Sequence, residues 1–118
     1  MILALTLPRL GSLMHQGTIH KLLAKAGDEL KPGTPLLEVR VDLGMAKAQD
    51  CPPLLFFRII ATERAYLRSL DASYAELLDV GARLGVATSD SNETTQGRPA
   101  RSLRTTSVVI QIDPLSRR

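Results

Sequence analysis

The sequence is poor in the residues that mark several classes of protein. It has one cysteine, Cys51, no tryptophan, and only 3% aromatic residues in a chain of 118. A single cysteine excludes an intramolecular disulfide and is typical of a reducing compartment, so we expect a cytoplasmic protein. Because single-stranded nucleic acids bind by stacking on aromatic side chains, the scarcity of these residues argues against such a partner.

The chain also lacks long apolar runs and a strong excess of charge. The run from Leu54 to Ala61 contains Arg58 and is far shorter than the roughly 20 residues that a membrane-spanning helix requires. The opening 1–7 is too short for the apolar core of a signal peptide and has no basic residue before it. The 15 Lys and Arg only slightly exceed the 12 Asp and Glu and are spread along the chain. We therefore expect neither a membrane nor a nucleic-acid partner.

No arrangement typical of a catalytic or metal site is found in the sequence. It has no Gly-x-Ser-x-Gly, no phosphate-binding loop, no dinucleotide fingerprint and no carboxylate pair at a suitable spacing. His15 and His20 are five residues apart, unlike ligands on one helix face, and Cys51 has no second cysteine to complete a site. We interpret the histidines as surface residues and the cysteine as an unreactive loop or buried residue. The protein is thus expected not to be an enzyme and to have no metal site.

The most informative feature that the sequence does contain is an internal repeat. When residues 17–39 are moved forward by 48 positions without a gap, six of them align with identical or similar residues. A unit of this size cannot form a core alone, so the repeat predicts two halves that bury their apolar faces against each other. The aligned pairs are Ile19 with Leu67, Leu22 with Leu70, Asp28 with Glu76, Leu30 with Leu78, Gly33 with Gly81, and Leu36 with Leu84.

Alternating apolar residues and turn residues predict the strands. Turns are expected at 26–29 and 31–33, where glycine, proline and aspartate supply the required backbone angles. The spacing of apolar residues from Thr62 to Tyr74 is also partly helical, but the repeat favours a strand at 66–70 followed by a turn at 79–81. The predicted strands are 2–7, 17–23, 37–42, 56–60, 66–70 and 83–87.

The first repeat unit and the residues before it resemble the start of a biotinyl/lipoyl domain. The resemblance covers residues 1–88, strongly in the first half and weakly in the second. It implies one all-β domain, a flattened β-barrel or barrel-sandwich hybrid made of two halves related by a pseudo-two-fold axis. The matching motifs are Pro8-x-Leu10-Gly11, Met14-x-x-Gly17-x-Ile19, Gly27-Asp28 and Gly33-x-Pro35-Leu36-x-Glu38-Val39, all at the spacing of that family.

The resemblance also indicates where such a domain would carry its cofactor. In lipoyl and biotinyl domains a lysine at the tip of a tight hairpin receives the cofactor. The corresponding tip here is Asp42-Leu43-Gly44, in which Leu43 stands in place of the lysine. Extra residues separate the two repeat units at this point, and Gly44 and Pro52-Pro53 disfavour regular structure. We therefore expect an extended hairpin loop at 43–53.

Two functions remain open from the sequence. In the first, the domain is unmodified at the tip, binds no cofactor, and acts as a non-catalytic docking or assembly module for a protein partner. In the second, it carries lipoate or biotin on a swinging arm, with Lys47 as a displaced acceptor. The resemblance implies a 2-oxo-acid dehydrogenase-like or carboxylase-like complex as the partner. The sequence favours the first function, because Leu43 supplies no amine.

The remainder of the chain, 89–118, differs in composition from the domain before it. From Thr88 to Arg104 the sequence is rich in Ser, Thr, Asn, Gln, Arg and Pro, which bury too little apolar surface to offset the entropy of ordering. We therefore expect a mostly disordered tail. Within it, Ser107 to Ile112 is a β-prone run that Pro114 ends. This run is either a loosely ordered end or a strand that pairs with a barrel edge or with a neighbouring molecule.

Overall fold

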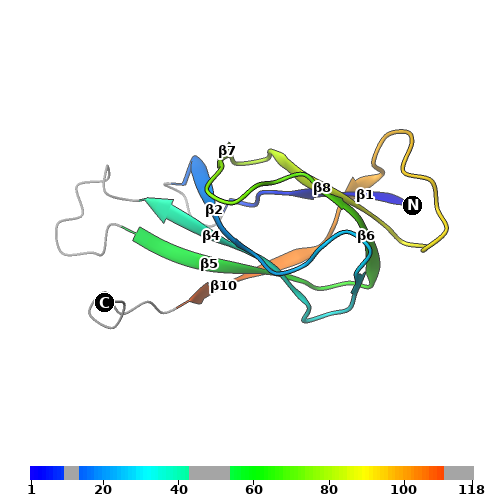
Figure 1. The fold of residues 1–118 in the computed structure, drawn as a ribbon, viewed down its shortest axis with the longest axis horizontal. Helices are drawn as coiled ribbons and strands as arrows, with labels where there is room; N and C mark the ends of the chain where they lie inside the picture. The colour runs from blue at the N-terminus through cyan, green and yellow to red at the C-terminus, as the bar shows by residue number, and fades with distance from the viewer. Residues whose placement is uncertain (10–13, 43–53, 111–118) are drawn as a thin grey trace.

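The strands form two sheets, each five strands wide. The computed structural model describes residues 1–9, 14–42 and 54–110, in which every regular element is a strand (Figure 1). Sheet A has the order β3-β6-β8-β1-β9 and sheet B the order β10-β5-β4-β2-β7. The predicted all-β fold is confirmed. The strands are β1 (Ile2–Thr6), β2 (Gln16–Leu22), β3 (Glu29–Leu30), β4 (Pro35–Asp42), β5 (Leu54–Ala61), β6 (Ala65–Leu70), β7 (Leu77–Asp79), β8 (Arg83–Thr88), β9 (Arg101–Ser102) and β10 (Thr105–Ile110).

The long strands correspond to the segments predicted from alternation. Strands β1, β2, β4, β5, β6 and β8 match the six predicted segments to within two residues at each end, and the ambiguous stretch at 65–70 is strand β6 rather than helix. The sequence does not predict β3, β7 or β9, because two or three residues are too few to show alternation. Within the described residues neither sheet closes on itself, so β3, β9, β10 and β7 are edge strands.

The two sheets repeat one pattern of strands. Moving β2, β3 and β4 forward by 48 residues places them on β6, β7 and β8. The first four strands of sheet B, read from its β7 edge, then correspond in order to the first four of sheet A, read from its β3 edge. The outermost strands differ, because β9 is parallel to β1 whereas β10 is antiparallel to β5. The irregularities repeat as well, since the register shifts between Ile19 and Lys21 against β4 and between Leu67 and Ser69 against β8. The internal repeat seen in the sequence is therefore a repeat of strand pairing.

Each repeat unit bonds its turn to the first long strand of the other unit, β6 or β2. The N–H of Gly27 donates to the carbonyl of Leu67 at 2.7 Å, and 48 residues later the N–H of Ala75 donates to the carbonyl of Ile19, also at 2.7 Å. We call these two bonds the reciprocal clamp. Because each bond joins one unit to the other, neither unit can form its full set of backbone hydrogen bonds alone.

The acidic residues of the repeat have the same role in both turns. The Asp28 carboxylate accepts a hydrogen bond from the N–H of Lys25 at 2.9 Å, and the Glu76 carboxylate accepts one from the N–H of Ser73 at 2.9 Å. The backbone carbonyl of Asp28 accepts from the N–H of Leu67, and that of Glu76 accepts from the N–H of Ile19, both at 2.9 Å. Leu67 and Ile19 are also the two acceptor residues of the clamp. An Asp and a Glu thus serve as equivalent turn residues despite their different lengths.

A single apolar core lies between the sheets. Ile19 and Val39 of sheet B and Leu67 of sheet A are all fully buried, and they belong to one cluster of packed side chains. Burial of each such side chain contributes about 1.5–3 kcal/mol to folding. The predicted burial of each half against the other is confirmed. The largest fully buried side chains are Leu3, Leu5, Leu7, Ile19, Leu30, Leu36, Leu37, Ile59, Leu67, Leu84, Val39 and Thr88.

The chain after β8 is more ordered than its composition predicts. β9 pairs in parallel with β1, Leu103 is only 5% exposed, and its N–H donates to the carbonyl of Ala4 at 2.8 Å. Composition predicts a mostly disordered tail because it reflects only the number of apolar side chains. It does not reveal the backbone pairing of β9 or the burial of a single leucine. The β-prone run is strand β10, which pairs with β5 through residue 110. Residues 111–118 lie outside the described part of the chain.

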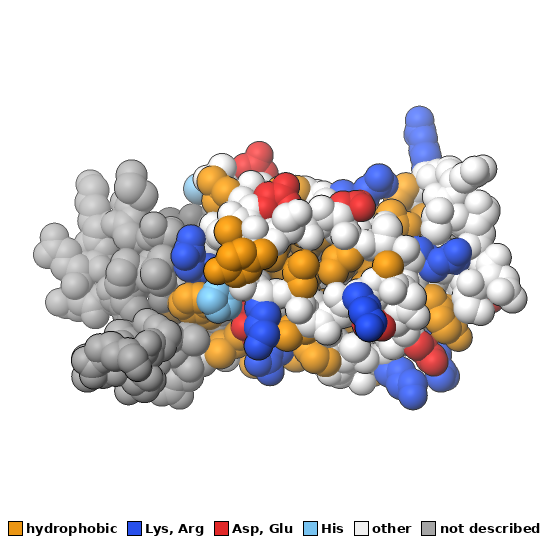
Figure 2. Space-filling view, viewed as in Figure 1, with side chains coloured by type: hydrophobic (Ala, Val, Ile, Leu, Met, Phe, Trp, Pro, Cys, Tyr) orange, Lys and Arg blue, Asp and Glu red, His pale blue; other side chains and the backbone are white. Residues whose placement is uncertain are grey.

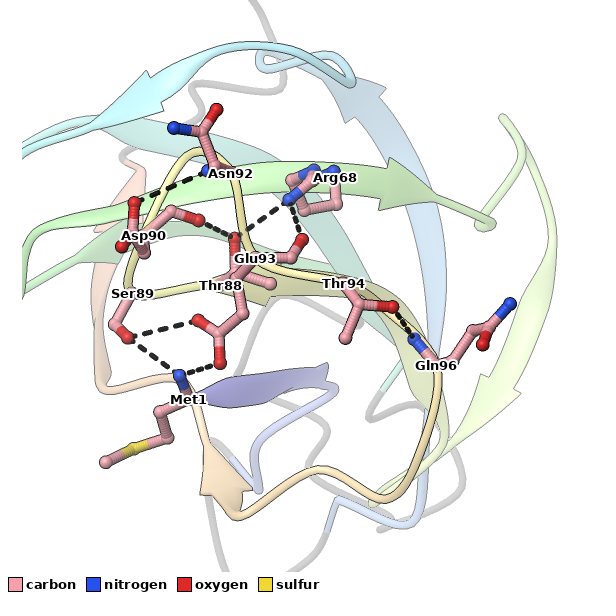
Figure 3. Close-up of polar contacts among 9 residues, drawn as sticks. All are labelled: Met1, Arg68, Thr88, Ser89, Asp90, Asn92, Glu93, Thr94 and Gln96. Atoms are coloured by element: carbon pink, nitrogen blue, oxygen red, sulfur yellow. Dashed lines mark hydrogen bonds and ion pairs between the residues drawn. The ribbon is translucent and has the colours of Figure 1, made fainter.

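Polar contacts hold the loop between β8 and β9 (Figure 3). The Arg68 guanidinium donates to the hydroxyl of Thr88 at 3.3 Å and to the carbonyl of Glu93, and the Thr88 hydroxyl donates to the carbonyl of Asp90 at 2.7 Å. The ammonium of Met1 contacts the Glu93 carboxylate. This loop lies at the end of the molecule opposite to the paired ends of β4 and β5 (Figure 1).

Glu63 fixes the segment that connects β9 to β10. The two terminal guanidinium nitrogens of Arg101 each donate to its carboxylate at 2.7 Å, and the N–H of Arg104 donates to the same group at 2.8 Å. The carbonyl of Arg104 in turn accepts from the N–H of Thr62 at 3.0 Å. The hydrogen bonds from Arg101, and then that from Arg104, lower the pKa of Glu63 to about 2, although burial opposes this shift.

The two clamp residues provide a matched test of backbone conformation. Gly27 has φ 98° and Ala75 has φ 69°, and a Cβ added to Gly27 would meet open space. Gly27→Ala should therefore destabilise the protein by about 1–2 kcal/mol through backbone strain alone. Ala75→Gly should not destabilise it, because relief of strain offsets the greater entropy of the unfolded chain. Urea unfolding of both variants measures this, and equal losses would contradict it.

The Glu63 contacts predict a loss of stability in acid. The pKa in the folded state, about 2, lies below the ordinary value of 4.5, so the unfolded state binds the proton more readily. This contribution should be complete above pH 4.5 and be lost as the pH falls towards 2. Glu63→Gln should be less stable than the wild type near neutral pH, and the difference should shrink in acid.

The control for this prediction is Glu29→Gln, which removes the more exposed carboxylate that pairs with Arg64. Its effect should be small at every pH, because exposed ion pairs contribute little. Denaturant unfolding over the acid range gives both curves. If the difference in free energy of unfolding between the wild type and Glu63→Gln stayed constant with pH, the lowered pKa assigned to Glu63 would be contradicted.

Candidate functional site

The candidate site is the end of sheet B where β4 and β5 meet. Antiparallel pairing of these strands runs from Pro35 opposite Ile60 to Asp42 opposite Leu54. Asp42 is thus the last residue of β4, and its backbone lies beside the first residue of β5. The ends of the expected hairpin loop are therefore held together by the sheet.

The other residues predicted for this site lie outside the described part of the chain. These are Leu43, Gly44 and Lys47, together with the rest of the loop 43–53 and Cys51. The structure places the root of the loop but not its tip. The predictions for the tip and for Lys47 as an acceptor remain predictions.

The outer face of sheet B near this root holds an aromatic contact that the sequence does not reveal. Phe56 on β5 is only 7% exposed, although it is opposite Arg40 on β4, which points to solvent. The ring of His20 covers it edge-on, with centroids 4.7 Å apart and planes at 68°. His15 is exposed, as expected of a surface residue, whereas His20 is half-buried. The bulge after Ile19 brings His20 to this position.

A shallow hollow lies beside the His20 ring. It has a volume of about 30 Å³, and its lining includes Thr18, His20, Arg40 and Tyr74. This is room for about one water molecule, and far less than the several hundred Å³ of an ordinary small-molecule site. The hollow is therefore too small to enclose a substrate.

The side chains around the hollow suit contact with a protein surface. Tyr74 is 72% exposed and Arg40 is also exposed, so both present their polar ends to solvent. Tyrosine and arginine are enriched at protein interfaces, where they combine apolar area with hydrogen-bonding groups. We call His20, Arg40, Phe56 and Tyr74 the His20 surface. Sequence reasoning does not assemble it, because Tyr74 comes from the second repeat unit and the others from β2, β4 and β5.

An ion pair lies on the same face, two residues further from the hairpin root along each strand. Arg58 on β5 donates to the carboxylate of Glu38 on β4 at 2.9 and 3.2 Å. The Glu38 side chain is 11% exposed and that of Arg58 43%. The pair satisfies a nearly buried carboxylate, so its role is structural. Elsewhere Lys and Arg side chains are scattered over the face shown in Figure 2 rather than gathered in one patch.

The described part of the chain contains neither a metal cluster nor a membrane-spanning helix. Within residues 1–9, 14–42 and 54–110, no three His, Cys, Asp or Glu side chains lie where they could hold a metal ion. In the same ranges there is no helix of the length and apolarity needed to cross a membrane.

Comparison with family models, with curated proteins and with solved structures finds no match to this chain.

Proposed function

We propose that this chain is a non-catalytic domain of the biotinyl/lipoyl type that serves as a docking or assembly module. The observation that best supports this is the reciprocal clamp, because its two bonds repeat with the 48-residue offset of the internal repeat, and two repeated halves are what the family resemblance implies. Two half-domains that share one core, with a hairpin rooted between β4 and β5, agree with the resemblance.

The residue at the hairpin tip argues against a carrier role. A swinging arm requires a nucleophilic amine at the apex of a protruding turn, where a ligase can reach it. Asp42 matches the residue that precedes the acceptor lysine in the family, but the next residue is Leu43. A leucine cannot form the amide bond that attaches lipoate or biotin. The proposed module therefore binds no cofactor at this position.

The proposed partner is a protein, and the His20 surface is the proposed contact. It lies on the outer face of sheet B near the root of loop 43–53, so both can meet one partner. Arg40 and Tyr74 supply a cation and an exposed aromatic ring. The family resemblance suggests a component of a 2-oxo-acid dehydrogenase-like or carboxylase-like complex.

The alternative function is a displaced carrier. Lys47 is the one lysine in the expected loop, in the setting Met45-Ala46-Lys47-Ala48. In this alternative the domain would carry lipoate or biotin on Lys47 and deliver it within the same kind of complex.

Intact mass distinguishes the module from the carrier. The full chain would be expressed with a lipoate ligase or a biotin ligase, beside a functional carrier domain as a positive control. We expect the wild-type chain to keep its unmodified mass while the control is modified. An adduct on the wild type that disappears in Lys47→Ala would establish the carrier alternative.

A capture experiment tests the docking surface. Tagged wild-type chain would be incubated with extract of its own source cells and should retain a partner. The double variant Arg40→Ala/Tyr74→Ala should retain at least about tenfold less of that partner, because aromatic and arginine contacts dominate interfaces. Arg83→Ala, an exposed arginine on sheet A, is the matched control and should retain the partner fully.

A second variant in the same experiment removes residues 43–53 and joins β4 to β5 by a short turn. Circular dichroism and thermal unfolding would first establish that each variant is folded. Capture that persists unchanged in both the double variant and the loop deletion would contradict the proposed contact.

A further inference from the structure

The four edge strands differ in how far they are protected against pairing with another chain. β3 and β9 have two residues each and include a charged one, Glu29 and Arg101. β7 has three residues and ends at Asp79. β10 has six residues, Thr-Thr-Ser-Val-Val-Ile, with no charge, proline or glycine. Short length and charge are the usual protections of an exposed edge, so β10 is the unprotected edge of the described sheets.

The free edge of β10 can be located from the hydrogen bonds at its start. The carbonyl of Arg104 accepts from Thr62, so residue 104 directs its backbone groups towards β5. Alternate residues of an antiparallel strand direct their groups to the same side. Residues 106, 108 and 110 therefore bond to β5, whereas Thr105, Ser107 and Val109 direct their N–H and carbonyl groups away from it.

The side chains of β10 leave apolar surface exposed on both faces of this edge. Val108 is 48% exposed and Val109 60% exposed, and adjacent residues of a strand point to opposite faces. β-branched side chains of this kind are favourable in cross-strand pairs. A strand added beside β10 would cover both valines.

We propose that β10 pairs antiparallel with β10 of a second copy of this chain, with Val108 opposite Val108 across a two-fold axis. The pairing would join the two copies of sheet B into one continuous sheet. The inference rests on the edge alone and is independent of the docking function proposed above.

The geometry of the edge fits a second copy in this register. A two-fold axis perpendicular to the sheet keeps the inner and outer faces aligned, so Val108 meets Val108 on the outer face. The same register places Ser107 opposite Val109, and these are residues whose backbone groups face the free edge. They can therefore exchange hydrogen bonds in the narrow pairs of an antiparallel ladder.

Charge favours the antiparallel arrangement of two identical strands. β10 is uncharged, so a second copy brings no unpaired charge to the paired segment. Parallel pairing would place the two exposed Arg104 side chains together, whereas antiparallel pairing puts them at opposite ends. On the outer face Arg58, the neighbour of Val108 on β5, is already paired with Glu38.

The expected association is modest in strength. Six residues span about 20 Å, and a single strand pair buries less than the roughly 1,200 Å² of a standard interface. We therefore expect a dissociation constant in the micromolar range, measurable by sedimentation between about 5 and 500 µM.

Sedimentation of the full chain is the first test. The wild type should change from monomer to dimer with concentration, and Val108→Lys should weaken association at least about tenfold because two like charges would then face each other. Val108 is half-exposed, so the variant is expected to fold. Leu77→Lys, at an exposed leucine of β7, is the matched control and should dimerise as the wild type does.

Three results would overturn the proposal. One is a monomer at all concentrations, which is also expected if residues after 110 of the same chain occupy the edge. Another is a dimer that Val108→Lys leaves unchanged, which would place the contact elsewhere. The third is growth beyond the dimer, because a two-fold contact closes on itself.

Disulfide formation tests the register. In a Cys51→Ser background, Val108→Cys places two thiols at a wide antiparallel pair, where Cα atoms are about 4.5 Å apart and a disulfide can form. Val109→Cys is the control, because residue 109 is more exposed yet is opposite Ser107. We expect Val108→Cys to cross-link at least about tenfold faster. Equal rates, or faster linkage at 109, would overturn the proposal.

Discussion

The fold depends on the reciprocal clamp between the two repeat units. The N–H groups of Gly27 and Ala75 are each satisfied only by a carbonyl of the opposite unit, at Leu67 and Ile19. Those two acceptor residues are also fully buried in the shared core. The same two residues thus provide both backbone hydrogen bonds and apolar burial. Breaking a clamp bond would therefore also disturb the packing of the core, and the reverse. This coupling is why the two units form one domain rather than two.

The structure also explains what the sequence could predict about the fold. The six long strands have alternating or continuous apolar residues, and the 48-residue repeat correctly selects strand over helix at 65–70. The repeat is visible because positions such as Gly33 and Gly81 must keep similar residues in both turns. The short strands β3 and β7 have no pattern of their own, and only the repeat of strand pairing reveals that they are equivalent. The composition of residues 89–110 does not predict their strands, because β9 is held by backbone bonds and Leu103 is a single leucine buried in the core cluster.

Of the candidate site, only the strand pairing at the root of the hairpin could be predicted from the sequence. Counting along the first unit places the hairpin root at Asp42, and the structure pairs that residue with Leu54. The His20 surface could not be foreseen, because it depends on the bulge after Ile19 and on a turn of the second unit that brings Tyr74 to β2. The Glu63 contacts were hidden for a similar reason, since their partners are about forty residues further along the chain.

The segment from 101 to 110 has a mechanical consequence for the molecule. Its first part, β9, extends sheet A beside β1, and its second part, β10, extends sheet B beside β5, with only Leu103 and Arg104 between them. It therefore acts as a staple across one side of the core. Separating the sheets there would require breaking a ladder in each of them. On the opposite side, bordered by β3 and β7, it would require breaking the reciprocal clamp as well, so neither side of the core can open without loss of strand pairing.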